Sequence, residues 1–161
     1  MSILAIGITA CIRIMLVLLF LPFSALDKVL NFRGAVAQAR QVAANPAIAT
    51  VLIVAGLFIE VFMSLGVVTG VADRACAFTL AAYCAATALL WKQFWKPGDF
   101  WASSTGQGRT LFWDFLKNLA VGAGFLLVTF GTQASMAAKF FADPLASSHP
   151  YQLVVQEPVR P

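Results

Sequence analysis

Glu60 interrupts a long apolar run of the sequence, with residues 56–59 before it and 61–63 after it. Arg13 interrupts an earlier apolar run in the same way. A charged side chain near the centre of a bilayer costs about 2.5–3.5 kcal/mol on insertion scales, so it usually faces a partner or a polar cavity. The two charges therefore predict a membrane protein in which Arg13 and Glu60 are turned away from lipid.

The composition also indicates that lipid is the solvent of this chain. Of its 161 residues, 60% are hydrophobic and only 11% are charged, whereas about 25% of the residues of a soluble domain are charged. A domain of this size leaves much of its surface exposed, so it cannot hide so many apolar side chains from water. The net charge of +4 comes without a stripe of basic and polar residues. We therefore expect contacts with membrane lipids and none with nucleic acid.

Four segments are long and apolar enough to cross a bilayer, for which about 20 residues are needed. They lie at about 3–26, 47–71, 75–95 and 115–136. The sequence predicts an all-α integral membrane four-helix bundle over residues 1–136, with both termini on the same side. A short helix is expected over 32–45. The pairs Asp143-Pro144, His149-Pro150 and Glu157-Pro158 disfavour a helix there, so residues 137–161 are predicted to form an extended tail.

The basic residues predict the orientation of the bundle. Seven Lys or Arg residues lie in or beside the loops 27–46 and 96–114, and three lie on the side of the termini. Basic residues near span ends favour the cytoplasmic side. We therefore expect a multi-pass protein of a bacterial-type inner membrane, with these loops cytoplasmic and the termini periplasmic or exterior.

Arg13 and Glu60 are predicted to lie at the same depth. Each is ten residues from the end of its span on the side of the termini, which is about 15 Å at 1.5 Å per residue. Neighbouring antiparallel helices would bring them together, and the planar guanidinium of Arg suits a carboxylate. Two interpretations of this ion pair remain open. It fixes the register of two spans, or it lines a polar site for a headgroup, a quinone or a proton.

Aromatic side chains crowd the region between the third and fourth spans. An aromatic belt at the membrane interface accounts for most of them. A more specific alternative is that Trp91, Trp95, Trp101 and Trp113 form a surface that binds a ring-shaped ligand or a partner. The cysteines and the single histidine have no metal-ligand spacing, so no metal site and no catalytic residue is predicted.

Several segments resemble the DoxX family of small membrane proteins. Residues 19–32 (LFLPFSALDKVLNF) resemble the end of the first helix of that family, and the stretch from Glu60 to residues 92–95 (KQFW) resembles its second and third helices. Residues 115–126 (FLKNLAVGAGFL) are similar to its fourth. The resemblance implies that Arg13, Lys28, Glu60, Lys117 and Asn118 occupy the family's polar positions.

The resemblance also implies a role near redox chemistry, because the family is associated with a thiosulfate:quinone oxidoreductase. The chain has no haem, nucleotide or metal motif of its own. We therefore expect an accessory subunit of a respiratory, photosynthetic or other redox complex, without an intrinsic cofactor, with bound lipid, and with its C-terminal tail contacting other membrane subunits. The alternatives are a quinone-linked oxidoreductase subunit and a small-molecule transporter. Whether the chain is an enzyme is left open.

Overall fold

The computed structural model describes residues 2–101 and 106–152. Within these residues all the regular elements are helices, and four helical segments are long and apolar enough to span a membrane. This confirms the predicted all-α fold with four spans. The segments are Ile3–Leu30, Pro46–Thr69, Asp73–Trp91 and Gln107–Phe130.

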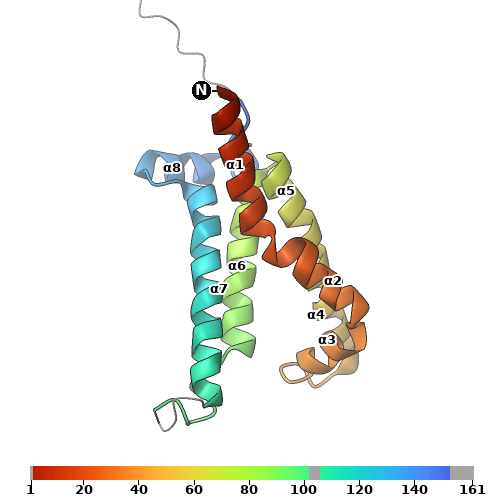
Figure 1. Ribbon diagram of the computed structural model, residues 1–161. Coiled ribbons are helices and arrows are strands. Elements are labelled where there is room, and N and C mark those ends of the chain that lie inside the picture. The colour runs from red at the N-terminus through yellow and green to blue at the C-terminus, as the bar shows by residue number, and fades with distance from the viewer. Residues whose placement is uncertain (1, 102–105, 153–161) are drawn as a thin grey trace, which may run out of the picture.

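The first span is broken near its middle (Figure 1). It consists of α1 (Ser2–Val17), a distorted turn η1 (Leu19–Ser24) and α2 (Ala25–Leu30). Pro22 has no N–H and its ring crowds the preceding turn, so a regular helix cannot pass through it. Leu21 accordingly leaves helical geometry, with φ −120° and ψ 111°, and the Leu21–Pro22 peptide is cis. As a result α2 points away from the axis of α1.

The second span contains a wider turn at Glu60. It consists of α4 (Pro46–Phe58), the π-helical turn η2 (Ile59–Met63) and α5 (Ser64–Thr69). The Asn45 side chain caps its start by accepting a hydrogen bond from the amide of Ala47 at 2.9 Å, and Pro46 suits the first helical position. The span ends at Gly70, whose φ of 82° favours glycine.

The third and fourth spans, α6 (Asp73–Trp91) and α7 (Gln107–Phe130), pack side by side as an antiparallel pair (Figure 1). Gly122 lies at this contact, where an added Cβ atom would be 3.4 Å from the Cβ atom of Cys84, so the space suits a small residue. Asp99 caps α7 by accepting hydrogen bonds from the amides of Gln107 and Gly108 at 2.7 and 2.8 Å.

Two short helices complete the fold. The predicted helix over 32–45 forms only over Phe32–Ala39 (α3), and α8 (Ala134–Ala142) follows the fourth span. The prediction of an extended tail from residue 137 is wrong for residues 137–142. The breaking residues begin only at Asp143-Pro144, and Phe140 is buried against Phe78 and Phe130, which anchors this last helix.

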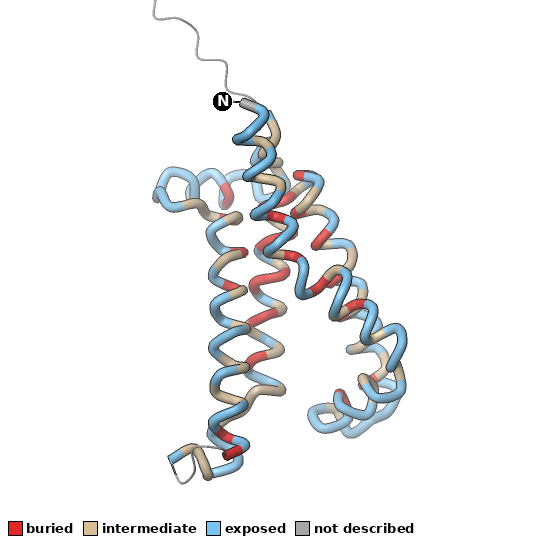
Figure 2. The backbone as a smooth tube through the Cα atoms, in the orientation of Figure 1, coloured by how far each residue is buried: buried red, intermediate tan, exposed pale blue. Residues whose placement is uncertain are grey.

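The two ends of the bundle differ. We call the end with α8 and the turn between α5 and α6 the tail end, and the end with α3 and residues 92–101 the loop end. The N-terminus of α1 lies toward the tail end (Figure 1). The buried residues concentrate in the half of the molecule nearer that end, and α2–α4 diverge from α6 and α7 toward the loop end (Figure 2). The main core cluster consists of Val17, Phe20, Val67, Cys76, Ala77, Leu80, Ala81, Cys84 and Phe125.

Candidate functional site: a polar cleft between the spans

Glu60 forms an ion pair with Lys28 inside the bundle. The Lys28 Nζ atom lies 2.6 Å from Glu60 Oε1, and the Glu60 side chain is only 2% exposed. Ser24 Oγ and the Tyr83 hydroxyl donate hydrogen bonds to the same oxygen at 3.0 and 2.9 Å. Three donors from two different spans therefore converge on one carboxylate oxygen.

The spacing of residues across η1 and α2, and a glycine in α4, bring these groups together. Ser24 and Lys28 are four residues apart across η1 and α2, so they lie on one face, and Lys28 Nζ donates to Ser24 Oγ at 2.6 Å. The absence of a side chain at Gly56 lets the Tyr83 hydroxyl approach α4, because a Cβ atom there would lie 3.0 Å from that hydroxyl oxygen.

The second carboxylate oxygen of Glu60 has no hydrogen-bond partner among the described residues. The hydroxyl of Ser64, one turn later in the same span, is also buried without one. A buried polar atom that lacks a partner costs about 1–3 kcal/mol, so such atoms are often completed by a water molecule or a ligand. Glu60 therefore retains an unused hydrogen-bond acceptor.

The predicted pairing of Arg13 with Glu60 is wrong. Arg13 Nη2 instead lies 2.7 Å from Asp73 Oδ2, and its Nη1 donates to the carbonyl of Val67 at 2.7 Å. The prediction rested on the matching depths of the two charges along their spans. Because the chain breaks at Pro22, Arg13 stays with the tail end while Lys28, beyond the break, reaches Glu60.

The described part of the C-terminal segment folds back onto this Arg13–Asp73 pair. The amide and hydroxyl of Ser148 donate to Asp73 at 2.8 and 2.5 Å, and Arg13 Nη2 donates to Ser148 Oγ at 3.0 Å. The Tyr151 hydroxyl donates to the carbonyl of Val68. These contacts fasten the segment to its own bundle.

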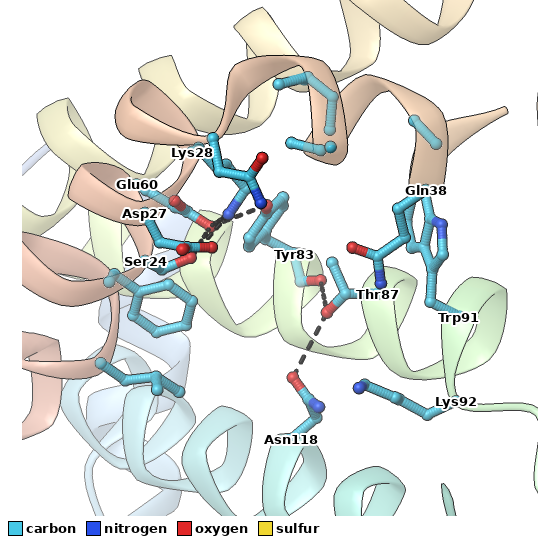
Figure 3. Close-up of a pocket in the computed structure, with 17 residues that line it drawn as sticks. Ser24, Asp27, Lys28, Gln38, Glu60, Tyr83, Thr87, Trp91, Lys92 and Asn118 are labelled. Carbon is cyan, nitrogen blue, oxygen red and sulfur yellow. Dashed lines mark hydrogen bonds and ion pairs between the residues drawn. The ribbon is translucent and has the colours of Figure 1, made fainter.

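A half-open cleft of ≈ 470 Å³ surrounds the Lys28–Glu60 pair. It lies between the first two spans on one side and α6 on the other, and Asn118 of α7 reaches it (Figure 3). Thr87 Oγ1 lies 3.4 Å from Asn118 Oδ1 at its wall. The polar and aromatic lining residues are Phe20, Ser24, Asp27, Lys28, Asn31, Gln38, Glu60, Tyr83, Thr87, Trp91, Lys92 and Asn118.

The structure divides the other predicted site residues into two groups. Trp91 and Asn118 line the cleft. Trp95, Trp101 and Trp113 are 51%, 94% and 55% exposed and lie outside it, so the four tryptophans do not form one surface around the ion pair. Lys117 is also outside the cleft, with its side chain 74% exposed and 3.4 Å from Asp114.

Sequence patterns indicated only part of this cleft. The spacing of Tyr83 and Thr87 predicts that they share one polar face of the third span, as they do. Gln38, which lines the cleft, and Asp73, which pairs with Arg13 outside it, were missed. Asp73 sits beside Arg74 at a span end, where a charge is ordinary, and Gln38 sits in a short helix expected at the headgroup level. Neither position carries a sequence signal for a site.

The comparison with protein families supports the resemblance noted above. The model of the DoxX family matches residues 8–93, which is more than half of the chain. The protein belongs to the DoxX family. The match includes Arg13, Lys28 and Glu60 and ends before Lys117 and Asn118. Neither a curated protein nor a solved structure matches the chain. With four apolar helices, this DoxX protein is a multi-pass membrane protein.

Proposed function

We propose that this DoxX protein is an accessory subunit of a membrane redox system and that its cleft binds a quinone-class ligand. The observation that carries the proposal is the buried Lys28–Glu60 pair, which faces a half-open cleft within the spans and keeps an unused acceptor oxygen. A polar group at this depth is costly unless it has a partner, and intramembrane charges commonly mark functional sites.

The residues around the cleft fit the two forms of such a ligand. Lys28 has three N–H donors, of which Glu60 and Ser24 take two, so one remains for a quinone carbonyl. The indole N–H of Trp91 is a further donor at the cleft wall, and its ring offers a flat surface. The hydroxyl of a quinol needs an acceptor, and the carboxylate of Glu60 at the cleft wall would provide one. The cleft volume lies within the roughly 300–1,000 Å³ of small-molecule sites.

The accessory role follows from what this site would leave to a partner. The residues of the cleft can hold and orient a ring, but none of these residues carries electrons through the membrane. A partner oxidoreductase would supply the electrons. Exposed apolar side chains on α1 and α4, including Ile12, Met15 and Phe58, provide surfaces that suit either lipid or partner helices. The C-terminal tail beyond its docked part is a further candidate contact.

The distribution of basic residues supports a location in a bacterial-type inner membrane. Seven cations in or beside loops 27–46 and 96–114, against three on the other side, favour cytoplasmic loops. The ligand-binding cleft would then open toward the cytoplasmic half of the membrane.

Quinone binding can be measured on the purified protein in nanodiscs. A short-chain benzoquinone and its quinol are titrated while tryptophan fluorescence and equilibrium binding are recorded. We expect Glu60→Gln to weaken quinol binding by about tenfold, the value of one hydrogen bond to a charged group. Thr69→Ala, in the same span but outside the cleft, should bind as the parent chain does. Equal affinity of the Glu60→Gln variant for the quinol, or no saturable binding by the parent chain, would refute the cleft as a quinone site.

The accessory role is tested by native purification. A tagged chain extracted in a mild detergent should co-migrate in fixed ratio with a larger oxidoreductase that contains a redox cofactor. Isolation solely as a monomer or homodimer, from cells in which the redox system is active, would contradict this role.

A further inference from the structure

A second cleft adjoins the one around Glu60. Its volume is ≈ 500 Å³, and it lies at the loop end of the bundle. Gln38, Trp91 and Lys92 line both clefts, so these three side chains form the neck between them. The other polar residues that line the outer cleft are Gln41, Gln93, Lys96 and Gln107, which water solvates readily. Its apolar lining residues are Val42, Leu90, Pro97 and Leu111.

Polar groups continue inward from this neck to the buried ion pair. Lys92 Nζ lies 3.2 Å from Asp114 Oδ2 near the entrance, and the Asn118 amide donates to the carbonyl of Asp114 at 2.9 Å. Thr87 lies 3.4 Å from Asn118, and Tyr83, one turn further along α6, donates to Glu60 at 2.9 Å. Figure 3 shows Asn118, Thr87, Tyr83 and Glu60 around the same cleft.

The space between these groups suits water. A water molecule occupies about 30 Å³ in the liquid and needs polar partners in a cavity. Both clefts are many times larger, and their walls offer hydroxyl, amide and charged groups. Beyond Glu60 toward the tail end, by contrast, Phe20, Leu80 and Phe125 form an apolar core. A chain of water molecules would therefore reach Glu60 from the loop end and not from the tail end.

We propose that the two clefts form a one-sided water path from the loop end to Glu60 and that this path carries protons to the ligand in the cleft. The proton role rests on the proposed quinone function. A quinone that becomes a quinol gains two electrons and two protons. The partner oxidoreductase supplies the electrons, and water at the loop end supplies the protons through the chain of water molecules that ends at Glu60 and Tyr83. Asp114 is a positioning residue that holds Lys92 at the neck, and Asn118 lines the path inside the neck.

Cysteine accessibility tests the path without any quinone. Thr87→Cys and Asn118→Cys are each compared with a lipid-facing neighbour on the same helix, Leu89→Cys and Leu119→Cys, which are 54% and 42% exposed in the parent chain. A charged, membrane-impermeant methanethiosulfonate is applied to sealed vesicles of either orientation, and labelling above that of the parent chain is measured. Both lining positions should react about tenfold faster than their neighbours, because water is absent from the lipid-facing positions. The reaction should occur only from the side of the loop end.

A block at the neck tests the route. Adding Gln38→Trp to the Asn118→Cys chain should slow labelling about tenfold, since the larger ring fills the space shared by the clefts. Labelling of Lys96→Cys, at the outer cleft, should not change. Equal labelling of lining and lipid-facing positions, labelling from the tail end, or indifference to the neck substitution would overturn the path. Failure of quinone binding with normal labelling would instead refute only the proposed ligand and leave the water path.

Discussion

At the scale of single residues, Glu60 depends on Lys28 for its charge compensation. Replacing Lys28 with Met would leave the buried carboxylate without a cation. Removing one partner of a buried pair costs roughly 3–5 kcal/mol, and we expect the lower part of this range because the Lys28 side chain is 18% exposed. The free energy of unfolding in detergent measures the effect. Lys117→Met, at a cation that is 74% exposed, should change stability little.

A paired substitution separates charge from packing at this site. Adding Glu60→Gln to the Lys28→Met chain removes the uncompensated charge, while the amide oxygen still accepts hydrogen bonds from Ser24 and Tyr83. We expect the double variant to recover most of the lost stability. A double variant as unstable as Lys28→Met would mean that the lysine acts through its packing.

The burial of single residues could be predicted from the sequence, but their partners could not. An isolated charge in an apolar run was sufficient to predict that Arg13 and Glu60 are buried, because lipid penalises any other placement. Their partners depended on tertiary structure. The break at Pro22 was visible in the sequence, but the direction that α2 takes after it was not. That direction decides that Lys28, and not Arg13, reaches Glu60.

At the scale of elements, the contact between α6 and α7 requires a small residue at position 122. A methyl group there would lie 3.4 Å from the Cys84 Cβ atom and 3.6 Å from the Ala81 carbonyl oxygen, which is ordinary contact. Gly122→Ala should therefore be neutral or slightly stabilising, since Ala is more favourable than Gly within a helix by about 1 kcal/mol. Gly122→Leu should force the helices apart and cost about 1–3 kcal/mol. Thermal unfolding in detergent distinguishes them. Gly7→Leu, where a Cβ atom meets nothing within 4 Å, is the control, and an equal loss there would contradict the packing argument.

The docked C-terminal segment is held to the bundle through Asp73. Ser148→Ala removes the hydroxyl that bridges Asp73 and Arg13, at a cost of about 1–3 kcal/mol to the docked state. We expect faster proteolysis within residues 143–152, with the membrane spans still folded. His149→Asn is the matched control, because His149 is exposed and its φ of 49° suits Asn. Unchanged proteolysis of the Ser148→Ala chain would show that other contacts, such as that of Tyr151, hold the segment.

Element boundaries were predictable where lipid sets the length of a helix, and less so elsewhere. The four spans follow from apolar length alone. The extent of α8 does not, because its helix is stabilised by the packing of Phe140 against residues of two spans. The cleft was still less accessible to prediction. Gln38 enters it only because α3 turns back after α2 and packs against α4, and no local pattern in the short helix indicates that path.

At the scale of the whole molecule, the two ends of the bundle should differ in stability. The tail end is held by the Arg13–Asp73 pair, by hydrogen bonds from Arg74 to the carbonyls of Thr129 and Met136, and by the apolar core. Toward the loop end, the cleft around Glu60 and the outer cleft separate α2 and α3 from α6. Local opening is easiest where few buried contacts must break. We therefore expect amides of α2 and α3 to exchange hydrogen faster than those of α6, as measured by hydrogen-exchange mass spectrometry in nanodiscs. A short-chain quinol should slow exchange in α2 and α3 but not in α8, because only the first two line the cleft. Slower exchange in α3 than in α6 without ligand would contradict a bundle that is closed at one end and open at the other.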